Sequence, residues 1–391
     1  METENTLPVL IVGGGIGGCA TALALAQRGI QVTVLEQTEE LREIGAGIQL
    51  GPNAFRVFDE LGVRHAVEKS VVYPDNLVMM DAVSGEKVTS MPLGEPFLNR
   101  YGQPYGVIYR ADLHQILIDA CRDRDGVTFL TGQKLADFDE DAQTVRVTTE
   151  TGRVHVGRAL IGADGLWSKV RERIVADGKP RVAGHIAYRA VLPTSQVPPE
   201  LRLNDMTLWA GPKFHLVQYP LRRGELFNLV AVFHSDRYEE GWDTYGDTAE
   251  LELRFKGACA PVKTLLSKIE TWRMWVLCDR EPAAEWSLGR TTLLGDAAHP
   301  MLQYMAQGAC MALEDAMSVS RHLAATSNPA VAFQNYQKER YLRTCRVQLT
   351  ARVYGEVYHA AGATRDLRNA YLTKRTPDQG IESLAWLYDP I

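Results

Sequence analysis

The chain opens with a strand, a glycine-rich turn, a helix and a second strand, and this order constrains its fold more than any other feature. Leu7–Val12 is a short apolar run that predicts a buried strand. Cys19–Gln27 is rich in alanine and leucine and predicts a helix, and Gln31–Leu35 predicts a second strand that ends at an acid. The turn between the first strand and the helix carries a G-x-G-x-x-G pattern, formed by Gly13, Gly15 and Gly18.

Each part of this unit suits a dinucleotide. Gly13 allows the tight turn, Gly15 lets the backbone approach a pyrophosphate, and Gly18 lets the helix pack closely on the strand. The helix N-terminus offers unpaired N–H groups to the phosphates. Glu36, directly after the second strand, can accept hydrogen bonds from the ribose of an adenosine. The unit therefore predicts a dinucleotide site that favours FAD or NAD over NADP, without separating the first two.

An acid further along the chain bears on that choice. Val154–Ala163 predicts a strand pair that runs into Asp164-Gly165. An acid placed directly after a buried strand lies where α/β sheets bind ligands. Asp164 is therefore a candidate cofactor residue, and the alternative is that it only ends the strand or caps a helix.

A second acid follows the same pattern. Thr291–Leu294 predicts a buried strand, Gly295-Asp296 follows it, and Ala309–Leu323 predicts a helix with one apolar face. We expect Asp296 to bind a hydroxylated chain such as the ribityl of a flavin. The helix that begins near Gly308 would aim its N–H groups at the isoalloxazine and stabilise negative charge on the reduced ring. Asp296, taken alone, could also be a strand terminator.

In this order and spacing, the three motifs resemble the single-component flavoprotein aromatic hydroxylases. The resemblance spans nearly the whole chain. It implies bound FAD, and it assigns to Arg110, at the start of a predicted helix, a contact with the FAD pyrophosphate. The sequence holds no second G-x-G-x-x-G, which supports this family over the flavoprotein disulfide reductases with their separate NAD fold. The fold class expected is α/β, with a Rossmann-type FAD-binding domain, a β-sheet substrate domain and C-terminal helices.

The substrate residues are expected between the two later motifs. Trp209–Pro220 predicts a strand in which His215 and Tyr219 share one face, and residues 225–234 predict a second strand after an Arg-Arg-Gly turn. The alternative for each side chain is ordinary packing, with His215 as an interior histidine and Tyr219 as a buried aromatic. The functional hypothesis has both facing a phenolic substrate, with His215 as the proton acceptor.

Gln303 narrows the substrate class. Many hydroxylases of this family, those of salicylate included, carry proline four residues after the motif histidine, whereas this chain carries Gln303 there. Together with His215 and Tyr219, it resembles the members that act on 3-hydroxybenzoate. That resemblance implies hydroxylation para to the hydroxyl to give 2,5-dihydroxybenzoate (gentisate), with NADH and O2 as cosubstrates and a flavin hydroperoxide as oxygen donor. The alternative for Gln303 is a loop amide that satisfies buried backbone.

Three readings of function stay open at this point. The first is the NADH-dependent hydroxylase of 3-hydroxybenzoate, and the second is a hydroxylase of salicylate, a hydroxynicotinate or another phenolic acid. The third comes from other classes: a nicotinamide-dependent Rossmann dehydrogenase or a non-catalytic flavin-binding protein. Flavin absorption in the pure protein would exclude the dehydrogenase.

Composition limits the partners. The 42 Lys and Arg residues against 48 Asp and Glu give a net charge of −6, without a basic cluster, which argues against nucleic acid and polybasic membrane binding. The six cysteines are scattered, with no C-x-x-C pair and no histidine at metal-ligand spacing, so we expect reduced thiols, no metal and a cytoplasmic enzyme. The apolar opening follows acidic residues and contains clustered glycines, which argues against a signal peptide or membrane span.

The motif order predicts discontinuous domains. The FAD-binding domain is expected over residues 1–74, 106–180 and 275–345, and the substrate domain over 75–105 and 181–274. Residues 346–391 are expected to form a C-terminal helical segment that covers the FAD domain. The resemblance implies a homodimer.

Overall fold

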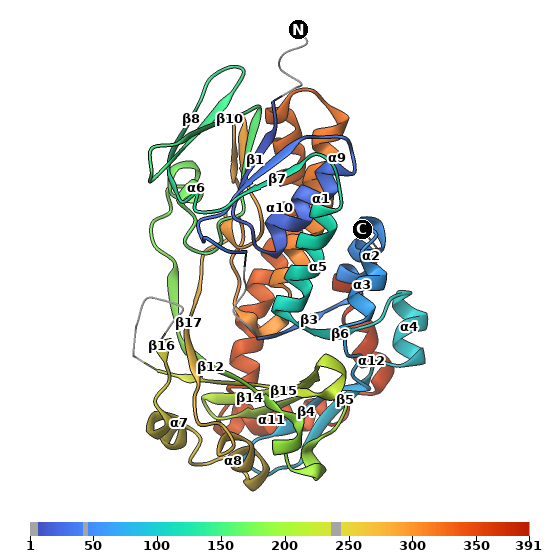
Figure 1. Ribbon diagram of the computed structural model, residues 1–391. Coiled ribbons are helices and arrows are strands. Elements are labelled where there is room, and N and C mark those ends of the chain that lie inside the picture. The colour runs from blue at the N-terminus through green and yellow to red at the C-terminus, as the bar shows by residue number, and fades with distance from the viewer. Residues whose placement is uncertain (1–6, 42–45, 236–243, 391) are drawn as a thin grey trace.

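The computed structural model describes residues 7–41, 46–235 and 244–390 of the protein, and these residues form four β-sheets. In Figure 1 the six-stranded sheet lies at the upper end and the eight-stranded sheet at the lower end. The long helix α10 (Pro329–Tyr358) runs between the two ends.

The predicted strand–helix–strand opening is confirmed. It forms β1 (Val9–Val12), α1 (Ile16–Ala26) and β2 (Val32–Leu35), and the helix begins earlier than expected. All four residues of β1 are buried because parallel neighbours lie on both sides and other elements, α1 among them, pack over the strand. The alanines of α1 leave room for this helix to pack closely against its neighbours.

The six-stranded sheet brings four strand ends into line. Val12 pairs with both Leu35 and Gly162, and Gly162 pairs with Leu293, so four parallel strands end at the same level. An edge strand, β18, is antiparallel to its neighbour. In order across the sheet the strands are β18 (Ser287–Leu288), β19 (Thr291–Leu293), β11 (Ala159–Gly162), β1, β2 and β7 (Val127–Leu130).

The eight-stranded sheet is mostly antiparallel and has two apolar faces. Alternate residues such as Leu216 and Phe233 pack on one face against α7 (Thr248–Arg254) and α8 (Ala260–Leu266). Residues of the opposite set, such as Val230, pack with the loop after β19 and with α10. In order, the strands are β16 (Thr244–Tyr245), β17 (Arg273–Asp279), β12 (Arg181–Pro193), β15 (Leu226–His234), β14 (Phe214–Leu221), β13 (Met206–Gly211), β4 (Asn76–Asp81) and β5 (Lys87–Pro92).

The single strand expected over Trp209–Pro220 is wrong. The structure divides it into the antiparallel strands β13 and β14, joined at Pro212 and Lys213. Lys213 takes the left-handed conformation (φ +63°) that a tight turn requires, a role that usually falls to glycine or asparagine. The expected second strand is β15, and the hairpin between β14 and β15 is confirmed.

The remaining elements connect and cover these sheets. The strand pair expected over Val154–Ala163 is present, but its two strands belong to different sheets. The smaller sheets are β10 (Val154–Gly157) with β9 (Val145–Thr149) and β8 (Leu135–Glu140), and β3 (Gly47–Leu50) with β6 (Gly106–Tyr109). The other helices are α2 (Pro52–Leu61), α3 (Arg64–Glu68), α4 (Glu95–Tyr101), α5 (Arg110–Arg122), α6 (Lys169–Ile174) and α9 (Gly308–Ala325). Short 3-10 turns in the described residues are η2 (Thr194–Gln196), η3 (Pro199–Leu201), η4 (Arg222–Gly224), η5 (Gly295–Ala297) and η6 (Gln303–Met305).

The C-terminal segment is helical, as expected, but it does not begin as a new element. The predicted boundary at residue 345 falls inside α10, which continues to Tyr358. Three shorter helices follow: α11 (Gly362–Leu372), α12 (Pro377–Glu382) and α13 (Ala385–Tyr388). All six cysteines lie in described residues, and none of them forms a disulfide. Of the helices in the described ranges, none combines the length and apolar character of a membrane span.

A buried ionic cluster joins α9 to α10 and to the loop after β19. Asp315 on α9 accepts hydrogen bonds from the Gly295 backbone N–H (3.0 Å) and from Arg340 Nε on α10 (2.7 Å), and it pairs with His299 Nε2 at 2.6 Å. Burial opposes ionisation of Asp315, but His299 and Arg340 prevail and hold its pKa below the ordinary value. Glu314 beside it pairs with Arg340 and Arg343.

Replacing Asp315 with asparagine removes the negative charge and keeps the shape. We expect D315N to lower the free energy of unfolding at pH 7 by about 3 kcal/mol, because Arg340 then loses a buried partner. Because folding lowers the pKa of this carboxyl, its contribution is present at neutral pH and is lost as the pH falls below about 4. The difference from wild type should therefore shrink there.

Urea unfolding at pH 7 and at about pH 3.5 measures both effects. The control is D366N, whose side chain is 77% exposed and should leave stability unchanged. Equal stability of D315N and wild type at pH 7 would contradict the role given to this carboxylate.

Candidate active site

The cofactor motifs follow the four aligned strand ends. Gly13 directly follows β1, and Glu36 directly follows β2. Asp164 and Asp296 lie within three residues of the ends of β11 and β19. Because neighbouring parallel strands end at one edge, that edge brings all four predicted residues together, at the position where α/β sheets bind ligands.

The turn after β1 has no space for side chains. Gly13 has φ +105°, and a Cβ there would lie 2.3 Å from the Ala163 carbonyl oxygen. A Cβ on Gly18 would lie 2.0 Å from the Gly13 carbonyl oxygen. Gly15 is the N-cap of α1 and has no side chain that could accept a hydrogen bond. No N-cap side chain therefore occupies the first backbone N–H groups of the helix. This cradle fits the pyrophosphate of a dinucleotide.

Glu36 is fixed beside this turn. Its Oε2 accepts a hydrogen bond from the Gly14 N–H (2.8 Å), and its Oε1 accepts one from the Thr38 N–H (2.9 Å). The carboxylate is therefore held at the end of β2 next to the glycine turn. That position fits the predicted contact with the adenosine ribose of FAD.

Arg110 is the first residue of α5, and its N–H donates to the Ala46 carbonyl (2.9 Å). One turn later His114 Nε2 lies 2.6 Å from the Gly14 carbonyl oxygen. Residues four apart share a helix face, so this contact turns the side of α5 that carries Arg110 toward the glycine turn. The sequence did not single out His114; its spacing from Arg110 was the available signal.

Asp164 points toward α6. Its Oδ1 accepts from Ser168 Oγ (2.6 Å), and its Oδ2 accepts from the N–H groups of Lys169 (2.8 Å) and Val170 (3.3 Å). Burial raises the pKa of Asp164, although these hydrogen bonds oppose the rise. The helix-capping alternative thus describes its side chain, and a contact with FAD stays a prediction.

Asp296 and the start of α9 face the same space. The Asp296 side chain is exposed, and a Cβ on Gly308 would lie 3.7 Å from its Oδ1. The N-cap of α9, Gln307, makes no side-chain cap. An acid beside an uncapped helix N-terminus fits a ribityl chain followed by the electron-rich end of a flavin ring.

His215 and Tyr219 lie on one face of the eight-stranded sheet, as expected, with Val217 between them. Both are buried, and four residues of extended strand separate their Cα atoms by about 13 Å. The Tyr219 ring lies against Gly47 of β3, whose N–H donates to Asn228 Oδ1 (3.0 Å). Burial raises the pKa of Tyr219, so its hydroxyl keeps its proton at neutral pH.

Gln303 meets this face through Arg189, a residue that the sequence did not single out. Arg189 Nη2 donates a hydrogen bond to Gln303 Oε1. In the sheet, Arg189 on β12 lies opposite Val230 on β15, and Val230 lies opposite Val217 on β14. Through Arg189, Gln303 is therefore linked to the row of residues that crosses β14 between His215 and Tyr219. The three predicted residues therefore surround one patch of the sheet, although no direct hydrogen bond joins them in the described residues.

Four histidines gather at the His215 end of this patch. His215 Nδ1 lies 2.7 Å from His359 Nε2, and His359 Nδ1 lies 3.1 Å from His234 Nε2. His185 is hydrogen bonded through Nδ1 to the Tyr304 hydroxyl (2.6 Å). Burial, aided by His185, lowers the pKa of His215 to about 3, so its imidazole is neutral at pH 7. These histidines come from distant segments, which is why sequence spacing did not reveal the cluster.

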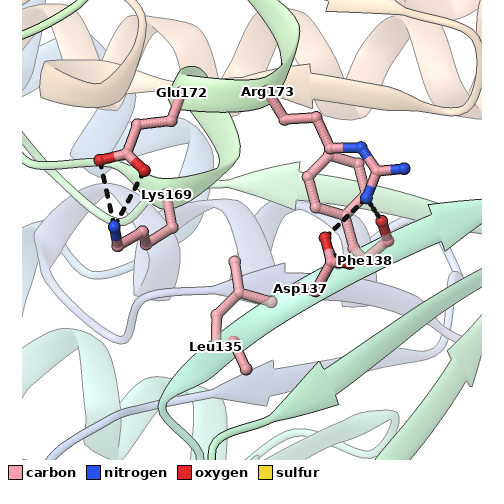
Figure 2. A pocket seen from close by; sticks show the side chains of 7 residues that line it. Leu135, Asp137, Phe138, Lys169, Glu172 and Arg173 are labelled. Atoms are coloured by element: carbon pink, nitrogen blue, oxygen red, sulfur yellow. Dashed lines mark hydrogen bonds and ion pairs between the residues drawn. The ribbon is translucent and has the colours of Figure 1, made fainter.

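A surface pocket of about 250 Å³ between β8 and α6 is not part of this arrangement. Figure 2 shows that its charged side chains face one another. Lys169 pairs with Glu172 (2.9 Å) and Arg173 with Asp137 (2.6 Å). Because these charges are already compensated, the pocket offers little to an ionic ligand.

Comparison with known proteins agrees with the motifs. A sequence profile described as an FAD binding domain matches residues 6–350. The chain is 47% identical to 3-hydroxybenzoate 6-hydroxylase of Polaromonas naphthalenivorans (strain CJ2), covering 99% of this chain and 97% of that protein. The chain belongs to the FAD-dependent aromatic hydroxylases. A second relative of the same name, from Klebsiella oxytoca, is 45% identical over 98% of this chain and 97% of its own length.

Solved structures of this family share the fold. The complex of Klebsiella pneumoniae HpxO with FAD and uric acid superimposes with a TM-score of 0.87 at 27% identity, covering 99% of this chain and 98% of that chain. A salicylate hydroxylase substrate complex gives a TM-score of 0.83 at 26% identity, covering 99% of this chain and 96% of that one. The expected fold class is confirmed, and the chain is a flavoprotein monooxygenase that binds FAD.

Alanine at Gly13 tests the cradle. We expect G13A to lose most of its bound FAD, because the new Cβ would displace the backbone at Ala163 where the pyrophosphate is expected to bind. The flavin absorbance per mole of purified protein measures the loss. The control is G29A on the same unit, where φ is also positive (+74°) but nothing lies within 4 Å of the new Cβ. Full FAD content in G13A would argue against this site.

Proposed function

We propose that the protein hydroxylates 3-hydroxybenzoate at the carbon para to its hydroxyl group, giving gentisate, with NADH as reductant and O2 as oxygen source. The observation that carries the proposal is the placement of His215, Tyr219 and Gln303 around one patch of the sheet face that meets the loop after β19. Near-full-length relatives named for this substrate support it.

His215 suits the role of proton acceptor. Its Nδ1 is engaged with His359, which leaves Nε2 as the nitrogen available to a substrate. The imidazole is buried and neutral, so it can accept the proton of a phenol. Sharing that proton raises the electron density of the ring, and an electron-rich ring reacts faster with an electrophilic oxygen.

Gln303 and Tyr219 suit the role of orienting groups. Because Arg189 donates to the carbonyl oxygen of Gln303, the amide NH2 of Gln303 is left as a donor toward the substrate. Tyr219 keeps its proton and can donate a second hydrogen bond. Two donors and one acceptor would fix which ring carbon faces the flavin.

Arg189 suits the substrate carboxylate. Its Nε is buried without a hydrogen-bond partner, and within the described ranges no carboxylate forms an ion pair with its guanidinium. Burial is the main cause that lowers its pKa, to about 10, so it stays positive at neutral pH. Arg189, Arg273 and Lys268 line a groove of about 550 Å³. Glu270 is the one acid that lines the same groove. A partly buried cation without a carboxylate partner, beside a groove with more basic than acidic residues, favours an anionic substrate.

When bound, FAD reduced by NADH would activate O2 and supply the electrophilic oxygen. The protein's share is to bind the ring beside the flavin, to hold the phenolic proton and to exclude water. The apolar packing of Val217, Met305 and Leu302 around the patch provides the dry surroundings that this chemistry needs. NADH as the reductant and a homodimer as the assembly remain predictions.

Product analysis tests the function. Purified FAD-loaded protein is mixed with NADH in air, with 3-hydroxybenzoate or with salicylate, and products are separated by chromatography. We expect 3-hydroxybenzoate to stimulate NADH oxidation and to give gentisate. Catechol from salicylate, with no response to 3-hydroxybenzoate, would contradict the proposal and favour a salicylate hydroxylase.

Replacing Arg189 with glutamine tests the carboxylate contact. We expect R189Q to raise the KM for 3-hydroxybenzoate at least about tenfold, equivalent to about 1.4 kcal/mol of lost binding, and to leave the affinity for uncharged 3-hydroxybenzyl alcohol nearly unchanged. Steady-state kinetics and flavin-fluorescence titration measure these values. The control R273Q removes a charge from the same groove and should change the KM less. An equal loss for both ligands would contradict a specific charge contact.

A further inference from the structure

The proton taken from a buried phenol needs a route to water. His215 is 2% exposed and His359 is 6% exposed, so solvent has little access to either imidazole. The low pKa of His215 means that this imidazole does not retain a proton at neutral pH. A base that does not retain a proton can still serve the reaction if it passes the proton to a neighbouring group.

The histidines provide that route. From the geometry we infer that His215, His359 and His234 form a proton relay between the substrate hydroxyl and solvent. The two nitrogen–nitrogen distances, 2.7 and 3.1 Å, are hydrogen-bond distances, and His234 at the outer end is only partly buried. The relay rests on the proposed function, because it begins at the substrate hydroxyl.

The transfer is balanced at each step. The substrate O–H bond breaks as an N–H bond forms at His215 Nε2, and His215 Nδ1 passes its proton to His359 Nε2. His359 Nδ1 then passes its proton to His234 Nε2, and His234 Nδ1 releases one to water. One proton leaves, no electron moves, and each imidazole changes tautomer. The reverse transfer returns a proton to the ring oxygen of the product and restores the starting tautomers.

The backbone fixes the relay's geometry. Lys213, in the turn between β13 and β14, donates its N–H to the His359 carbonyl (3.1 Å) and accepts from the His234 N–H (3.0 Å). The backbones of His359 and His234 are therefore attached to the same turn. His234 at the outer end is the least buried of the three histidines, and burial lowers its pKa, with the exposed carboxylate of Glu356 opposing the fall. His234 therefore passes a proton on to water and does not store it.

The same cluster fits a metal ion less well. Ligand nitrogens of His185, His234 and His359 lie within 4.8 Å of one another. Zinc bonds of about 2.0 Å in a tetrahedron place ligand nitrogens about 3.3 Å apart. Moreover, both ring nitrogens of His359 are occupied by the contacts with His215 and His234. Hydrogen bonding between imidazoles accounts for the observed spacing without an ion.

Proton release on substrate binding tests the relay. The FAD-loaded enzyme is mixed with 3-hydroxybenzoate in weak buffer containing a pH-indicator dye, and release is followed by stopped flow. In H359Q the amide can hydrogen bond to both neighbours but cannot exchange a proton between its two ends. We expect H359Q to release the proton at least about tenfold more slowly, with FAD content and substrate affinity within about twofold of wild type.

Two further variants keep the test decisive. H185N changes a buried histidine that belongs to the same cluster but not to the relay, and this variant should release protons at the wild-type rate. H234A removes the imidazole at the outer end of the relay. We expect this variant to release protons slowly, and imidazole added to the buffer should accelerate the release. Wild-type release by H359Q, an equal loss in H185N, or no effect of imidazole on H234A would each overturn the relay.

The relay and the proposed function fail separately. If the wild-type enzyme forms gentisate while H359Q releases protons normally, the relay is wrong and the function stands. If wild type forms no gentisate, the function is wrong, and the comparison of variants is made with the phenolic acid that wild type does hydroxylate.

Discussion

The buried carboxylate of Asp315 is the contact on which the rest of the site depends. It joins the Gly295 N–H after β19, the side chain of His299 and Arg340 of α10. One charge thereby fixes the loop that carries Asp296 and the long helix that extends to the substrate sheet. Moving this buried carboxylate away from Arg340 would leave an uncompensated charge, so the three contacts favour one arrangement.

From this anchor, α10 organises the second half of the site. Gln348 donates to the Pro300 carbonyl (2.9 Å), and the Tyr358 hydroxyl donates to the Tyr304 carbonyl (3.2 Å), so the loop that carries Gln303 is held along the helix. The helix ends beside His359, whose ring contacts His215 and His234. The cofactor edge and the substrate face are thus positioned by the same helix, although they belong to different sheets.

The parts that the sequence predicted are local ones. A strand, a glycine turn, a helix and an acid are adjacent in the chain, so these elements were predicted correctly from their order, while their contacts with FAD stay predictions. His215 and Tyr219 were placed on one face because side chains alternate along a strand. The turn at Pro212 and Lys213 was missed although Gly211-Pro212 is a turn signal, because the alternating pattern on both sides was interpreted as one strand.

The missed residues share a different property: their partners are far away in the chain. Arg189 reaches Gln303 across 114 residues, and His359 reaches His215 across 144. Nothing in the spacing of arginines or histidines reveals such pairs, because only the packing of α10 and β12 on the sheet creates them. The proposed contact with a substrate carboxylate follows the same logic, since only the folded structure shows that Arg189 has no carboxylate partner among the described residues.

The most direct test is a crystal structure of the FAD complex with 3-hydroxybenzoate. The account predicts the phenolic oxygen within hydrogen-bond distance of His215 Nε2, the carboxylate facing Arg189, and the ring between the start of α9 and Val217. A substrate ring bound elsewhere, or one whose carboxylate rather than hydroxyl faces His215, would contradict it.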